Sequence, residues 1–112
     1  SWEKDIGYTQ VIKVDKTLYL SGITSEGDSF TQQLNGIYKK IEGILSDYSV
    51  STDNIIKEVI YTKDIEQLKS AISIRKKYFK HTVFPSATWV QIDQLFMDNY
   101  LIEVEVIAVV NQ

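Results

Sequence analysis

The chain has 112 residues, enough for one domain with its own core, and its 44% hydrophobic and 24% charged residues are ordinary for a globular protein. Its 15 acidic side chains outnumber its 12 basic ones, and the formal charge of -3 argues against nucleic-acid binding through bulk charge. Cysteine is absent and His81 is the one histidine, which excludes disulfides, thiolate metal sites, a cysteine nucleophile and any site that needs two imidazoles.

Apolar runs along the chain are short. No segment approaches the roughly 18 consecutive apolar residues of a membrane span, and the first residues lack the hydrophobic core of a signal peptide. We therefore expect a cytoplasmic protein that contacts no membrane.

The first half of the chain predicts a β-hairpin followed by a helix. Segments 8–14 and 17–23 are rich in β-forming residues and are joined by the polar pair Asp15-Lys16. Segment 25–29 breaks this pattern and supplies candidate N-caps. Apolar residues then recur at three- and four-residue steps, which predicts a helix from about Ser29 to Asp47.

The second half predicts a strand, a helix and two further strands. Segment 55–62 has the composition and length of a strand, and Asp64 is a candidate N-cap for the helix that follows. Pro85 closes the linker after that helix, and the last two strands are expected at 86–93 and 100–110. The buried stripe of the second helix is expected to be formed by Ile65, Leu68, Ile72 and Phe79.

This order of elements predicts a single α+β domain over residues 1–112, with two helices on one face of a mixed sheet. Side chains alternate along a strand, so Glu103, Glu105, Ile107 and Val109 face away from the helices. That second face is still largely apolar. Because monomers rarely expose large apolar patches, we expect it to be buried against other subunits of a homo-oligomer. Glu105 is expected either to face that interface or to lie near a solvated edge.

Several segments resemble the YjgF family of reactive-intermediate deaminases. The similarity rests on Tyr8, Thr17 to Gly22, Glu58 to Asp64, Phe84-Pro85 and the closing strand Ile102 to Val109. These segments lie in the family's order over nearly the whole chain. The closing I-E-x-E-x-I-A-V strand, combined with the upstream S-G and F-P pairs, is the most specific part.

The resemblance implies a chorismate-mutase-like fold and a homotrimer with small-molecule clefts between neighbouring subunits. Deaminase members hydrolyse 2-imino or enamine acids to 2-oxo acids and ammonia, without a cofactor or metal of their own. The family's pocket tyrosine falls on Tyr8, its Ser-Gly pair on Ser21 and Gly22, and its water-activating glutamate on Glu103. Seclusion between subunits is expected to raise the pKa of that glutamate toward a useful range.

One departure from the family falls in the segment after Phe84-Pro85. Deaminase members have an arginine there that binds the substrate carboxylate through two hydrogen bonds, and this chain has Ala87. Thr88 remains as a polar contact, and Trp89 replaces a side chain that is often small in the family. We therefore expect Ala87, Thr88 and Trp89 to line a narrower pocket for a neutral or planar ligand, with inefficient deamination of 2-imino acids.

Two other residues have simpler interpretations. Arg75, the one arginine, lies beside Lys76 and Lys77 and is interpreted as a solvated helix residue rather than a relocated anchor. His81 follows the second helix in a polar loop and is interpreted as a surface residue rather than a catalyst.

Three functions stay open at this point. The first is a small-metabolite-binding trimer that hydrolyses or tautomerises imine- or enamine-type intermediates, with Glu103 positioning water. The second is a non-catalytic ligand-sensing or regulatory protein. The third is an endoribonuclease, which the negative charge and the lack of a histidine pair disfavour.

Overall fold

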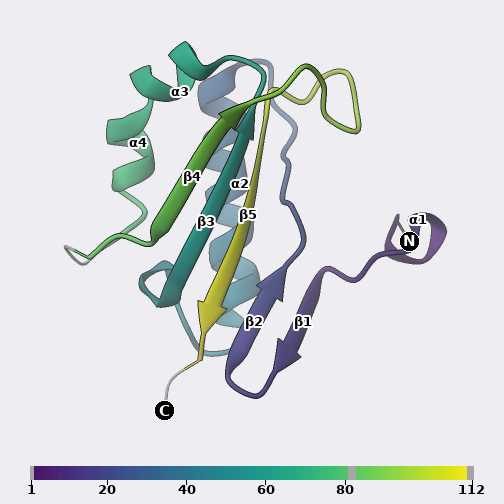
Figure 1. The fold of residues 1–112 in the computed structure, drawn as a ribbon, viewed down its shortest axis with the longest axis vertical. Helices are drawn as coiled ribbons and strands as arrows, with labels where there is room; N and C mark the ends of the chain where they lie inside the picture. Colours follow the sequence, from purple (N-terminus) through teal and green to yellow (C-terminus); the bar gives the residue numbers. More distant parts are fainter. Residues whose placement is uncertain (1, 81–82, 111–112) are drawn as a thin grey trace.

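The computed structural model describes residues 2–80 and 83–110 of the chain (Figure 1). Helices and strands are interspersed along the sequence, with a 3-10 turn, η1, before the third strand. In chain order the elements are α1 (Trp2–Ile6), β1 (Val11–Val14), β2 (Thr17–Leu20), α2 (Phe30–Ser46), η1 (Thr52–Asn54), β3 (Ile55–Thr62), α3 (Ile65–Ser70), α4 (Ile72–Lys76), β4 (Ser86–Gln91) and β5 (Ile102–Val109).

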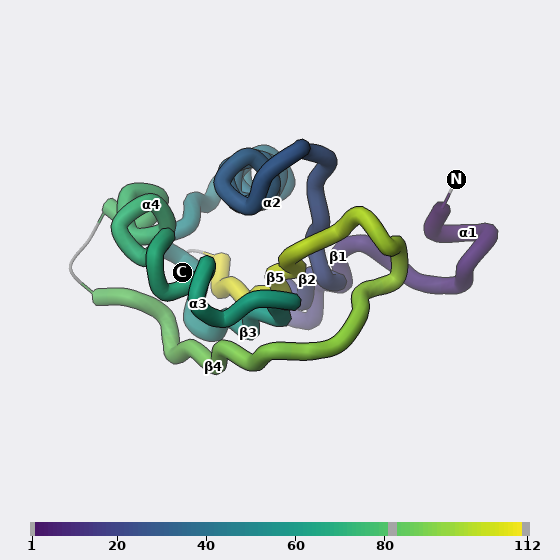
Figure 2. The backbone as a smooth tube through the Cα atoms, turned by 90° about the horizontal axis from the view of Figure 1, so that it is seen from above, coloured from purple at the N-terminus to yellow at the C-terminus, as the bar shows by residue number. Residues whose placement is uncertain are grey.

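The strands form one 5-stranded sheet in the order β1-β2-β5-β3-β4. Neighbouring strands run antiparallel except β3 and β4, which run parallel and are connected through α3 and α4. Helices α2 and α4 lie on the same side of this sheet (Figure 2). The predicted α+β class and mixed sheet are confirmed.

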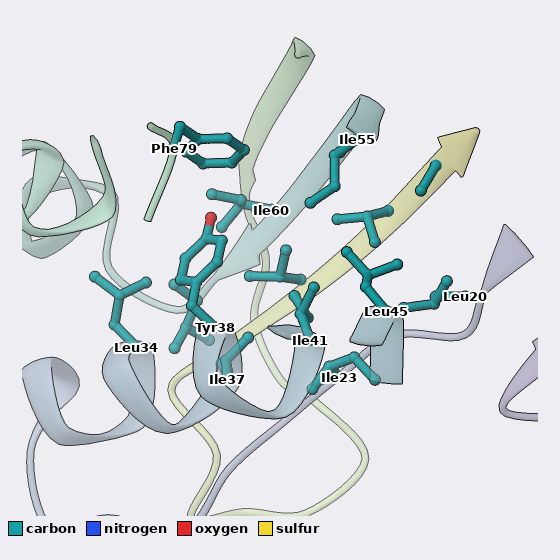
Figure 3. Packing of buried hydrophobic residues seen from close by; sticks show 14 of the residues in the cluster. Leu20, Ile23, Leu34, Ile37, Tyr38, Ile41, Leu45, Ile55, Ile60 and Phe79 are labelled. Atoms are coloured by element: carbon teal, nitrogen blue, oxygen red, sulfur yellow. The ribbon is translucent and has the colours of Figure 1, made fainter. Parts of the chain in front are cut away.

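Helix α2 is the long helix that the apolar spacing predicts. It begins after Ser29, whose hydroxyl accepts a hydrogen bond from the Gln32 backbone N–H, and it ends at Asp47. Its buried face meets the sheet, and Figure 3 shows Ile37, Ile41 and Leu45 pointing toward the strands. This apolar contact is the main source of the core's stability.

The two faces of β5 differ as the alternation predicts. Ile102, Val104, Val106 and Ala108 are buried against the helices, whereas the residues between them are only half-buried. On the neighbouring strand β2, Tyr19 lies on the uncovered face with 47% of its surface exposed. The uncovered face of the sheet thus carries apolar side chains that the single chain leaves accessible.

The last two strands are slightly shorter than expected, and the elements differ more from the sequence expectation at three other places. The hairpin strands are shorter than 8–14 and 17–23 because the chain leaves the sheet after Leu20, apart from one bridge between Ile23 and Val104. The first residues form α1, a helix that the periodicity does not reveal. The second helix divides at Ala71, whose ψ of 9° departs from helical geometry and separates α3 from α4.

Candidate functional site

A cavity of about 790 Å³ lies beside the end of β2, within the size range of small-molecule sites. Its walls come from the N-terminal segment, the segment after β2, α2 and the connection between β4 and β5. The lining residues are Trp2, Ile6, Tyr8, Gln10, Ser21, Gly22, Ile23, Thr24, Lys40, Gly43, Ile44, Asp47, Phe96, Tyr100 and Glu103.

Glu103 enters this cavity from β5, next to Gly22. The bridge between Ile23 and Val104, with N–H to O distances of 2.8 and 3.0 Å, holds the two segments side by side. A Cβ atom at Gly22 would collide with the carboxylate of Glu103. Glycine at this position therefore makes the room that the Glu103 side chain occupies.

The pKa of Glu103 is raised above its ordinary value, mainly because burial penalises the ionised form and secondarily because Glu105 adds a like charge. Glu105 lies two residues further along the same face and accepts a 3.1 Å hydrogen bond from the Tyr61 hydroxyl. The sequence expectation attributed such a rise in pKa to seclusion between subunits, whereas here burial within one chain already produces it. A carboxylate with a raised pKa is a better proton acceptor than an exposed one.

Tyr8 is brought to the cavity by the turn that ends α1. Gly7 adopts a left-handed φ of 94°, and the backbone N–H groups of Gly7 and Tyr8 both donate to Glu3 O, at 2.9 and 3.0 Å. The Ser21 hydroxyl donates to Thr9 O at 2.6 Å, which ties this N-terminal segment to the end of β2. The cavity wall next to Glu103 is thereby fixed by backbone contacts.

Aromatic side chains form another part of the cavity rim. Trp2 of α1 meets Phe96 of the β4–β5 connection edge-on, with ring centroids 5.7 Å apart. In Figures 1 and 2, α1 extends away from the sheet on the side where this connection lies. Tyr100 is buried in the same wall. This rim suits an apolar group of a ligand.

Gln33 of α2 positions two of these walls. Its side-chain oxygen accepts from Leu101 N at 2.8 Å, and its amide nitrogen donates to Asn99 O at 2.9 Å and Gly27 O at 3.0 Å. The buried amide therefore fastens both the β4–β5 connection and the segment after β2 to α2.

Helix α2 contributes one face to the cavity, formed by residues three and four positions apart, namely Lys40, Gly43, Ile44 and Asp47. The Lys40 ammonium donates to Thr24 O at 2.7 Å. Gly43 has open space where a Cβ would stand. Within residues 2–80 and 83–110, no group of three or more His, Cys, Asp or Glu side chains is placed to hold a metal ion.

Four of the residues that the sequence singled out meet in this cavity, namely Tyr8, Ser21, Gly22 and Glu103. The other three lie on β4, at the far edge of the sheet. Ala87 and Trp89 stand in register with Glu58 and Ile60, whose side chains are buried on the helix side, whereas Thr88 faces the uncovered side. One chain by itself does not bring these β4 residues to Glu103.

Arg75 is a correction to the sequence interpretation. It is buried rather than solvated, with 5% of its surface exposed, and its guanidinium binds Glu58 through Nη2 at 2.7 Å and Nε at 2.8 Å. It also stacks near the rings of Phe79 and Trp89, at 4.9 and 5.1 Å from their centroids. His81 lies outside the residues that the structure describes.

Lys40, Trp2 and Phe96 were not anticipated as cavity residues. A signal for Lys40 was present, because a glycine near the end of the helix, Gly43, flanked by Lys40 and Asp47 at helical spacing, marks a face that the core does not fill. No local sequence pattern marked Trp2 and Phe96 as cavity residues, because their contact joins segments that are far apart in the sequence.

Known proteins share this architecture. A crystal structure of a member of the highly conserved YjgF/YER057c/UK114 family from Mycobacterium tuberculosis superposes with a TM-score of 0.89, covering 97% of this chain and 92% of that one at 22% identity. A RutC family protein of Aquifex aeolicus is 32% identical over 110 residues, covering 91% of this chain and 87% of the relative. The human 2-iminobutanoate/2-iminopropanoate deaminase is 28% identical over 110 residues, covering 91% and 79%.

The fold is therefore that of the YjgF proteins. Residues 3–110 match the family described as Endoribonuclease L-PSP, and the chain belongs to this family, which includes the YjgF and RutC proteins. The resemblance seen in the sequence is confirmed. Among the described residues, no helix has both the length and the apolar character to cross a membrane.

Proposed function

We propose that this chain forms a homotrimer that binds a small metabolite in clefts at its subunit interfaces and hydrolyses imine- or enamine-type intermediates there. Glu103 positions and deprotonates the attacking water. The observation that carries the proposal is a half-buried carboxylate with a raised pKa on the wall of a ligand-sized cavity. The human relative's name, an imine deaminase, describes the same chemistry.

The reaction needs little machinery because the carbon of a protonated imine is already electrophilic. The water oxygen adds to this carbon while its proton passes to the Glu103 carboxylate. Glu103 then returns the proton to the nitrogen and the C–N bond breaks. The remaining hydroxyl proton passes to Glu103 and from there to solvent, so the products are a carbonyl compound and ammonia. An enamine first takes a proton at carbon to become the imine.

The oligomer is supported by the uncovered face of the sheet. Tyr19 and Ile107 stand directly opposite each other there, and Val90 of β4 is 37% exposed on the same side. Packing these side chains against other copies removes apolar surface from water. An interface at this face also brings Thr88, which lies on the uncovered side of β4, toward a neighbour's cavity, where it contributes to the predicted cleft.

The test is hydrolysis of imines released in situ by an amino-acid oxidase, measured against spontaneous hydrolysis. We expect little acceleration for 2-iminopropanoate, because Ala87 offers no arginine and the cavity is much larger than this ligand. We expect clear acceleration for imines with large apolar side chains. Glu103→Gln removes it, and Glu66→Gln, on the exposed surface of α3, leaves it unchanged. Acceleration that survives in Glu103→Gln contradicts the mechanism.

A ligand-sensing protein without catalysis is the second candidate, and Ala87 is the observation that favours it. Ligand-dependent thermal stabilisation without product formation supports this alternative. Ala87→Arg separates the two, because it adds turnover of 2-iminopropanoate only where Glu103 is already a competent base.

A further inference from the structure

The cavity that holds Glu103 carries a cation on its other wall. Among the described residues that line it, Lys40 is the one with a cationic side chain. Its ammonium donates to Thr24 O at 2.7 Å, which directs it along the cavity wall. An ammonium has three donors, so further hydrogen bonds remain available. The salt bridges found among the described residues, Lys69–Glu66 and Arg75–Glu58, do not involve it.

Arg75 does not supply this charge. Its Nε and Nη2 both bind Glu58, it is buried, and it lies on the helix side of the sheet, away from Glu103. A ligand that recruited Arg75 would have to break a buried ion pair. Lys40 needs no such rearrangement.

The acidic groups around the cavity leave room for an anion beside Lys40. Asp47 lies seven residues further along α2, which separates it from Lys40 by about 10 Å along the helix axis. Glu103 reaches the cavity from the sheet, and Glu26 lies beside Tyr100, where it accepts a hydrogen bond from Asn99 Nδ2. A negatively charged group near Lys40 is thus attracted by the ammonium and lies well away from Asp47.

The remaining walls are apolar. Trp2 and Phe96 are 50% and 68% exposed despite their mutual contact, and Ile6 and Ile44 line the same space. Exposed aromatic side chains around a cavity are well suited to cover an apolar group of a ligand.

We propose that Lys40 binds the carboxylate of the ligand, whose apolar portion contacts the Trp2–Phe96 wall. The ligand is then an organic monocarboxylate with a large apolar side chain, in place of the neutral ligand that Ala87 suggests. This inference rests on the proposed function in one respect, because it assumes that the ligand binds in the cavity that contains Glu103. It makes Lys40 a specificity-determining residue that acts by charge.

The test compares 3-phenylpropanoate with 3-phenylpropanamide, two stable probes that differ mainly in charge, by titration calorimetry near neutral pH. The unmodified protein is expected to bind the acid roughly 1.5-fold to fivefold more tightly than the amide, the effect of one exposed charge pair. Added salt reduces this preference. Lys40→Gln abolishes it, whereas Lys39→Gln, at the adjacent exposed position outside the cavity, preserves it.

Equal affinity of the unmodified protein for both probes, binding of neither, or a preference that persists in Lys40→Gln overturns the assignment. Turnover separates this result from the proposed function. Suppose that Lys40→Gln loses the preference for the acid while Glu103→Gln retains turnover. This pattern refutes the catalytic role of Glu103 but supports the binding role of Lys40. In the opposite pattern, Glu103→Gln is inactive and Lys40→Gln shows an unchanged KM. This pattern refutes the binding role of Lys40 and leaves the catalytic role of Glu103 in place.

Discussion

Arg75 and Glu58 form a buried ion pair beneath the sheet, with Nη2 of the arginine 2.7 Å from Oε1 of the glutamate. The Tyr38 hydroxyl of α2 donates to the other carboxylate oxygen, and burial together with the Glu58 charge raises the Tyr38 pKa well above its usual value. The network joins β3, α2 and α4 at the centre of the helix-covered face.

Removing either charge is expected to destabilise the fold strongly. Arg75→Met and Glu58→Leu should each lower the free energy of unfolding by about 3–5 kcal/mol, because the partner is left buried and unpaired. The double variant Glu58→Leu/Arg75→Met should cost less than the sum of the single changes. Urea unfolding measures these values, and Lys76→Met, at the exposed neighbour, is the control. Additive effects would show that the two groups do not interact.

The alternation along β3 could have revealed this pair. Glu58, Ile60 and Thr62 share one face, and that face is the one that the helices cover, so Glu58 had to be buried and had to have a partner. Because Lys76 and Lys77 follow Arg75 in the sequence, Arg75 was instead interpreted as a solvated residue. Helix α2 was predictable within one residue at each end because its apolar spacing and the Ser29 cap agree.

The cavity was predictable only where one strand pattern determines it. The alternation of β5 placed Glu103 on the uncovered face, and the resemblance placed Gly22 and Tyr8 near it. The Trp2–Phe96 contact depends on how two distant segments pack, which no local pattern encodes. The break at Ala71 likewise escaped the periodicity, which continues across it.

Gly22→Ala is expected to remove turnover while the protein still folds. The added methyl group occupies the place of the Glu103 carboxylate, which lies at the end of a flexible side chain and can rotate away. We expect a loss of kcat comparable to that of Glu103→Gln, with a free energy of unfolding within about 1 kcal/mol of the unmodified protein. Kinetics and urea unfolding of the same preparation measure both quantities. Full activity in Gly22→Ala would mean that the carboxylate works from another position.

Substitutions of Gly43 separate stability from ligand binding. Gly43→Ala should raise the free energy of unfolding by about 0.5–1 kcal/mol, because alanine favours the helix and its methyl group meets open space. Gly43→Leu should fill part of the cavity and weaken binding of 3-phenylpropanoate. Thermal unfolding and calorimetry test the two effects. Unchanged affinity in Gly43→Leu would place the ligand elsewhere.

The pH dependence of turnover should reflect the ionisation of the Glu103 carboxyl group. Water activation requires the ionised carboxylate, so the rate falls as the pH drops through the raised pKa, at a higher pH than an ordinary glutamate gives. Glu105→Gln removes the like charge and should move this acid limb to lower pH, although Tyr61 then loses its carboxylate partner. Glu66→Gln should leave the limb in place. A limb that does not move in Glu105→Gln would assign it to another group.

The same raised pKa has a consequence for stability. Between the unfolded and the folded pKa of Glu103 the native state binds more protons, so the free energy of unfolding falls as the pH rises through this window. The stabilising contribution of protonated Glu103 is fully present below the pKa that Glu103 has in the unfolded chain. Glu103→Gln should flatten this part of the stability profile, as measured by urea unfolding at a series of pH values. A profile that keeps its slope in the variant would exclude Glu103 as the source.

A charge on the uncovered face should dissociate the oligomer. Tyr19 and Ile107 stand opposite each other on β2 and β5, so Ile107→Glu buries an unpaired carboxylate in any interface formed there. We expect the unmodified chain to sediment as a trimer and Ile107→Glu to sediment as a monomer. Thr31→Glu, on the exposed surface of α2, serves as the control and should remain trimeric. Because the predicted clefts lie between subunits, turnover should fall with the trimer. A stable monomer of the unmodified chain in dilute buffer would refute both the interface and the clefts.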